Sequence, residues 1–134
     1  MHRRPGDRAE DGAAVVEFVL VGVLLLFVFM GVVQVGLVLH TRKVLAAAAA
    51  EGARHAANLG ADPASGGGWT QELLAHSLPA AGRQVTCTGS GAMGPGGLPL
   101  ATVTCQGRMR LTFLPLGVSV PLHVTGRAVK ETAQ

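Results

Sequence analysis

Few side chains in this sequence have types and spacings that would support chemistry. No CxxC pair is present, and no serine or cysteine has a neighbouring histidine and acid that would activate it. The five histidines show no spacing typical of metal ligands: His2, His40, His55, His76 and His123. We therefore predict no catalytic residue, no metal site and no cofactor, and we expect a protein that is not an enzyme.

One glycine pattern has the form of a dinucleotide-binding loop. Gly89-Ser90-Gly91-Ala92-Met93-Gly94 matches GxGxxG and follows a predicted strand. A dinucleotide site needs a helix that begins at these glycines and points its N-terminus at the pyrophosphate. The following Pro95-Gly96-Gly97-Leu98-Pro99 forbids such a helix. We therefore predict a hairpin loop from Gly89 to Pro99 and no small-molecule substrate.

The two cysteines, Cys87 and Cys105, are candidates for one disulfide. An exported domain would favour the bond, whereas a cytosolic domain would favour two free thiols. Facing residues of a hairpin lie symmetrically about its loop, and the midpoint of the two cysteines is Gly96, inside the predicted loop. Both cysteines also fall on the apolar face of their strands. They would then be opposed at a separation that a disulfide spans.

A long apolar segment runs from Phe18 to Leu39, interrupted only by Gln34. As a helix it would be about 33 Å long, enough for a hydrocarbon core of roughly 30 Å. A cleaved secretory signal has a shorter apolar region followed by a small-residue site. Here the alanines 46–50 lie beyond the charged Arg42-Lys43, so we predict a retained single-pass transmembrane helix.

Glu17 lies at the N-terminal edge of this apolar run, five residues after Gly12. An unpaired carboxylate is costly in hydrocarbon, but near a helix N-terminus it meets a favourable dipole. An interfacial charge without any role would have the same position. Its place relative to Gly12, where a polar leader ends and a helix is expected to begin, favours a functional role.

The remaining sequence predicts an α+β domain with a short helix on a three-stranded antiparallel sheet. Thr70 is the expected N-cap of the short helix, with Trp69 and Leu74 as a hydrophobic staple. Apolar residues alternate at odd positions from Val103 to Phe113 and at even positions from Val118 to Val124. Within the last strand, Pro121 indicates a sheet edge.

Glycine, proline and charge divide the chain into five expected regions. Gly52 and Ala56 form a small-xxx-small pair that would let another helix approach, although an exposed alanine-rich helix without a partner would have the same pattern. Net charge is +3 with dispersed basic residues and few aromatics, which argues against nucleic-acid binding. The regions are a disordered polar leader (1–12), a transmembrane helix with a helical extension (13–58), a flexible linker (59–68), a small extracytoplasmic domain (69–129) and a tail (130–134).

The segments Gly12-Ala-Ala-Val-Val-Glu17-Phe18 and Glu51-Gly52-Ala53-Arg54-His55-Ala56-Ala57, with the apolar helix between them, resemble the TadE-like family of minor pseudopilins of tight-adherence (Flp-type) pili over residues 12–58. The end of the chain, Val120 to Val129, also resembles the family's terminal strand. The resemblance implies that a prepilin peptidase cuts after Gly12 and leaves Ala13 as the N-terminus. It implies that Glu17 and Phe18 act in assembly, with Glu17 pairing with a neighbour's N-terminal amine. The implied partners are the membrane, the prepilin peptidase and other pilus-assembly proteins or pseudopilins. Ala13 departs from the Phe of many type IV pilins, and Phe18 from the Tyr of major Flp pilins, so a TadE-like protein is favoured over a major subunit.

Charge alone does not orient the helix, because Arg3, Arg4 and Arg8 precede it and Arg42, Lys43 and Arg54 follow it. The disulfide geometry and the resemblance favour a cytoplasmic N-terminus and an extracytoplasmic C-terminal domain in the cell membrane. Incorporation into a surface pilus stays open. The alternative is a single-pass anchored extracytoplasmic binding domain unrelated to pili, in which residues 69–128 bind a ligand or cell-wall component and Gly12 is never cut.

Overall fold

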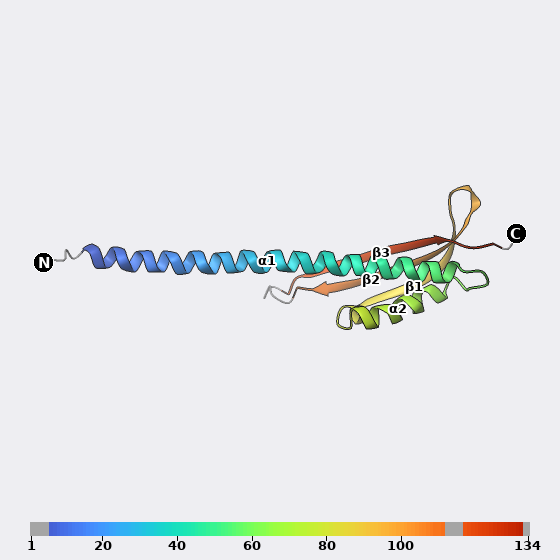
Figure 1. Ribbon diagram of the computed structural model, residues 1–134, viewed down its shortest axis with the longest axis horizontal. Coiled ribbons are helices and arrows are strands. Elements are labelled where there is room, and N and C mark those ends of the chain that lie inside the picture. The colour runs from blue at the N-terminus through green and yellow to red at the C-terminus, as the bar shows by residue number, and fades with distance from the viewer. Residues whose placement is uncertain (1–5, 112–116, 133–134) are drawn as a thin grey trace. The chain divides into compact units, whose positions relative to one another are not determined.

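Two α-helices and one three-stranded antiparallel sheet make up the described chain (Figure 1). The computed structural model describes residues 6–111 and 117–132, with side chains from residue 12 onward. The predicted α+β class is confirmed. The elements are α1 (Gly6–Ala57), α2 (Ser65–Ser77), β1 (Val85–Met93), β2 (Pro99–Arg110) and β3 (Ser119–Val129), with 3-10 turns at Gly82–Gln84 and Pro95–Gly97.

Helix α1 begins earlier than the sequence predicts. It starts at Gly6, so the expected disorder of the leader is wrong for residues 6–12, and residues 1–5 lie outside the described part. No proline occurs between Pro5 and Pro63, so nothing in the sequence interrupts the ladder of backbone hydrogen bonds. The chain forms two compact units, Met1–Gly36 and Leu37–Gln134. The division therefore falls inside α1, after Gly36.

The sheet has the order β1-β2-β3, and β1 pairs with β2 in the predicted register. Cys87 pairs with Cys105, and the two form a disulfide with a Cα–Cα distance of 4.1 Å. The alternation also holds, because β2 buries its odd positions and β3 its even ones: Ala101, Val103, Cys105, Leu122 and Val124. Pro121 lies in β3, which is an edge strand as predicted. The expected strand end at Phe113 lies outside the described residues, and β2 ends at Arg110.

The hairpin loop is shorter than expected. Strand β1 continues to Met93, so the predicted loop from Gly89 to Pro99 is reduced to Gly94–Leu98. Gly96 and Gly97 have φ of 77° and 76°, a conformation that glycine adopts without steric cost. The GxGxxG segment therefore lies on a strand and in its turn, and no α-helix begins there.

Helix α2 begins at Ser65, inside the segment predicted as a flexible linker. The carboxylate of Asp62 accepts a hydrogen bond from the Ala64 N–H at 3.0 Å, which stabilises the turn into the helix. Thr70 is therefore not the N-cap. It is fully buried inside α2, and its hydroxyl donates to the Gly66 carbonyl at 2.8 Å. Trp69 does not staple to Leu74 but stacks on His55, with ring centroids 4.3 Å apart.

The second part of α1 and the whole of α2 pack on the same face of the sheet (Figure 1). Their shared core contains Leu45, Ala49, Ala53, Leu74 and Val103. The small residues of α1 allow close packing: a Cβ on Gly52 would run into the Thr70 side chain and the Gly66 carbonyl. The prediction that another helix approaches at Gly52 is therefore confirmed, and that helix is α2.

Candidate functional site

The predicted processing and assembly residues all lie on α1 and are exposed: Gly12, Ala13, Glu17 and Phe18. A Cβ on Gly12 would meet no atom within 4 Å. Ala13 and Glu17 are four residues apart, so they share one face of the helix, one turn from each other. The structure therefore brings these two residues to one side and leaves both the Gly12 backbone and the Glu17 carboxylate accessible.

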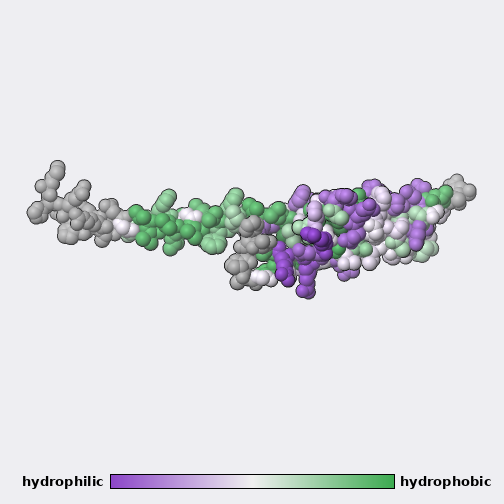
Figure 2. Space-filling model, turned by 90° about the horizontal axis from the view of Figure 1, so that it is seen from below, coloured by the Kyte–Doolittle hydropathy of each residue, from purple (hydrophilic) through white to green (hydrophobic). Residues whose placement is uncertain are grey.

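The surface of α1 from Gly12 to Phe29 is unusually apolar for a chain on its own. Every residue from Gly12 to Phe29 is exposed, including Phe18, Leu26 and Phe27. Figure 2 shows this apolar surface along the N-terminal part of α1. Within the described residues one helix, over Gly12–Ala57, is long and apolar enough to cross a membrane. A helix that is apolar on all sides needs lipid or other helices around it.

The Glu51-Gly52-Ala53-Arg54 segment divides into an inward and an outward side. Gly52 and Ala53 are buried against α2 and the core. Glu51 and Arg54 point outward and form an ion pair at 3.4 Å, with side chains 57% and 73% exposed. An exposed pair of this kind contributes little to folding. The inward residues therefore hold the fold, while the outward pair is available to a partner.

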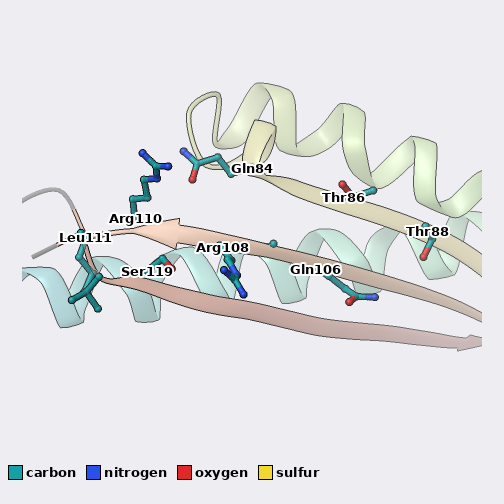
Figure 3. Close-up of a pocket in the computed structure, with 11 residues that line it drawn as sticks. Gln84, Thr86, Thr88, Gln106, Arg108, Arg110, Leu111 and Ser119 are labelled. Atoms are coloured by element: carbon teal, nitrogen blue, oxygen red, sulfur yellow. The ribbon is translucent and has the colours of Figure 1, made fainter.

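The outer face of the sheet carries an open polar hollow at the end of β2 (Figure 3). Arg108 and Arg110 line it together with Gln84 of the 3-10 turn and Ser119 of β3. Its other polar residues are Thr86, Thr88 and Gln106. Among the described residues no group of three or more His, Cys, Asp or Glu side chains is placed to hold a metal ion.

A comparison with known families bears on the N-terminal part of the chain. Residues 12–54 match the model of the TadE-like protein family. The TadE-like match begins at Gly12 and ends at Arg54, so it confirms the resemblance for the first motif, the apolar helix and the first four residues of the second motif. It does not extend to residues 55–58 or to Val120–Val129, whose resemblance stays a prediction. Together with the helix that can cross a membrane, it supports a membrane protein related to pilus assembly. No curated protein and no solved structure matches the chain.

Sequence reasoning missed several residues that position the sheet beside the TadE-like segment. The Gln71 amide donates to the Val85 carbonyl at 3.0 Å and to the Gly82 carbonyl at 3.1 Å, and it accepts from the Cys87 N–H at 3.2 Å. Gln71 thereby occupies backbone groups on the free edge of β1. Nothing in the local sequence identifies this role. Gly66 and Gly67, read as linker, are buried in α2, and Asp62-Pro63 just before them is the turn signal that would have indicated the helix start.

Proposed function

We propose that this chain is a membrane-anchored TadE-like minor pseudopilin or pilus-assembly factor that is cut after Gly12 and assembles through its N-terminal helix. The observation that carries the proposal is the beginning of the TadE-like match at Gly12, directly before the fully exposed, mainly apolar part of α1 with one carboxylate at its edge. The proposal assigns a prepilin peptidase and other pilus proteins as partners.

Processing would hydrolyse the peptide bond between Gly12 and Ala13. Water adds across the bond, leaving a carboxylate on Gly12 and an amine on Ala13. Glycine suits this position in two ways. It lowers helix stability by about 1 kcal/mol relative to alanine, which eases local unwinding in a protease cleft. The space around its α-carbon is also open, with no atom within 4 Å of a Cβ position.

The new amine on Ala13 would lie one helical turn from Glu17, at a rise of about 6 Å. This amine, from the same chain or from a neighbouring one, would supply a positively charged partner for the Glu17 carboxylate. An unpaired carboxylate within an apolar bundle is expensive, so pairing would favour one register between adjacent helices. Phe18, which is 78% exposed, would add apolar area to the same contact.

The topology in this proposal has a cytoplasmic N-terminus and an extracytoplasmic sheet unit. The disulfide between Cys87 and Cys105 supports that orientation, because disulfides persist in oxidising compartments and are rare in the cytosol. From there the protein would either enter a filament or prime its assembly.

The test is N-terminal sequencing of the mature protein and a piliation assay in the native host. We expect a mature chain that begins at Ala13. Gly12→Val should block maturation, because a branched side chain would enter a cleft that accepts none. Glu17→Ala should permit cleavage and membrane insertion but impair assembly.

Two matched variants act as controls for these effects. Gly22→Ala changes another glycine of α1 with open space around it and should be processed normally. Glu17→Asp keeps the charge and should assemble better than Glu17→Ala. A mature chain that still begins at Met1, with normal assembly in every variant, would leave only an anchored binding domain unrelated to pili.

A further inference from the structure

We propose that the sheet unit binds anionic phospholipid headgroups through a basic end formed by Arg42 and Lys43 of α1 and Arg108 and Arg110 of β2. We name these four residues the basic end. The inference rests on membrane anchoring by α1, but not on processing at Gly12, on pilus assembly or on which leaflet the unit faces.

The path of β3 along α1 places the two arginines of β2 at this end. Gly126 of β3 lies against the backbone of Ala49. Three residues earlier, His123 lines a groove with Leu39, Arg42 and Lys43. Followed from Gly126 to His123, strand β3 therefore runs along α1 toward Leu39.

The register extends this path to β2. Within β3, Pro121 pairs with Arg108 and Ser119 pairs with Arg110. Both pairs lie beyond His123, on the side toward Leu39. Figure 3 shows Arg108 and Arg110 near the β2 end, beside Gln84 and Ser119. Two different segments thus bring two cations each to the same end of the unit.

The charge at this end is not balanced within the described chain. All four side chains are exposed, and the ion pair found among the described side chains is Glu51–Arg54, which does not involve them. Of the acids in the unit, Glu131 and Asp62 lie toward the opposite end, where the Glu131 N–H bonds to the Ala57 carbonyl, and Glu51 is paired with Arg54. Glu72 is on α2, beside Gln71, and no ion pair joins it to any of the four basic side chains among the described residues. The basic end is therefore free to attract anions.

The position of the basic end selects lipid as the anion. Leu39 is the last residue of the apolar run, so a membrane-spanning α1 brings Arg42 and Lys43 to headgroup depth. Arginine guanidinium groups bind phosphate oxygens in pairs of hydrogen bonds. Each lysine or arginine close to an anionic surface increases affinity by a factor of about five, so Arg108 and Arg110 together would contribute about 30-fold.

The experiment measures lipid retention by the full chain. The protein is purified in mixed micelles of detergent, phosphatidylglycerol and phosphatidylcholine, and the lipids bound per chain are counted by native mass spectrometry. We expect selective retention of phosphatidylglycerol. Arg108→Gln with Arg110→Gln should reduce that selectivity by about 30-fold, and 0.5 M NaCl should reduce it in the wild-type chain.

A matched double variant at the opposite end of the unit distinguishes the effect of where the charges lie from the effect of losing two charges. Arg127→Gln with Lys130→Gln removes the same charge where β3 ends, and it should leave the selectivity within about twofold of wild type. Retention of both lipids in equal amounts, or equal losses in the two double variants, would overturn the proposal. Flotation of the chain with liposomes reports anchoring separately: failure to float would refute the membrane helix, whereas flotation without selectivity would refute the basic end alone.

Discussion

The two parts of α1 have opposite relations to their surroundings. From Gly12 to Phe29 every residue is exposed, and from Phe18 to Phe29 every side chain except Gly22 is large and apolar. From Leu37 onward the helix belongs to the compact sheet unit and buries a stripe with helical spacing, made of Thr41, Leu45, Ala49, Ala53 and Ala56. The first part lacks a packed face, whereas the second has one lined mainly by small residues.

This difference shows how one helix can serve two environments. Large apolar side chains on all sides suit lipid or a helical bundle, where the surrounding medium is also apolar. Small residues on one side suit close packing, as where Gly52 meets Gly66 and Thr70. The TadE-like match covers both parts, so it joins a segment that needs external partners to one that is satisfied within the chain.

Removing the disulfide should produce the largest effect and should affect the sheet unit alone. The bond links residues 18 apart in sequence, and closing such a loop contributes about 3 kcal/mol to the free energy of unfolding. Cys87→Ala with Cys105→Ala should lower it by about that amount. Urea unfolding of the full chain in detergent, followed by Trp69 fluorescence, measures the change at the contact between α1 and α2. Unchanged stability would show that the disulfide does not support this unit.

Two glycines of α1, Gly52 and Gly36, allow a direct test of the difference between the two parts of the helix. A Cβ on Gly52 would meet the Gly66 carbonyl at 2.7 Å, whereas a Cβ on Gly36 would meet nothing within 4 Å. Gly52→Ala should therefore destabilise the sheet unit by about 1–3 kcal/mol through overpacking. Gly36→Ala should have no such cost, because alanine is favoured in a helix by about 1 kcal/mol. Thermal unfolding of the two variants in the same detergent makes the test, and equal melting temperatures would contradict the packing seen at Gly52.

The smallest expected effect concerns the outward pair of the TadE-like segment. Glu51 and Arg54 are exposed, so Glu51→Gln with Arg54→Gln should change the free energy of unfolding by less than about 0.5 kcal/mol. Piliation in the native host is the second measurement. A loss of piliation at unchanged stability would assign the pair to a partner contact. A large loss of stability would show instead that the pair supports the fold.

Sequence reasoning performed best where a pattern repeats over many residues. The apolar run of α1 and the period of two in β2 and β3 were predicted correctly, and the symmetry of Cys87 and Cys105 about Gly96 gave the correct register. It failed at the boundaries of elements. The start of α1, the start of α2 and the length of the hairpin loop all differ from the prediction. For α2 the reason lies outside the local segment, because Gly66 and Gly67 pack on Gly52 and on the β1 backbone.

The sequence by itself therefore determined the apolar helix, the register of β1 with β2 and the resemblance of the N-terminal segment, since each follows from residue types at fixed spacing. Only the tertiary structure decided why Gly66 and Gly67 belong to a helix: α2 must pass within contact distance of Gly52 and of the β1 backbone, and glycine in that helix leaves room for both. The tertiary structure also decided which basic side chains lie at one end of the sheet unit. Arg42 and Arg108 are far apart along the chain, and the path of β3 along α1 brings them to the same end of the unit.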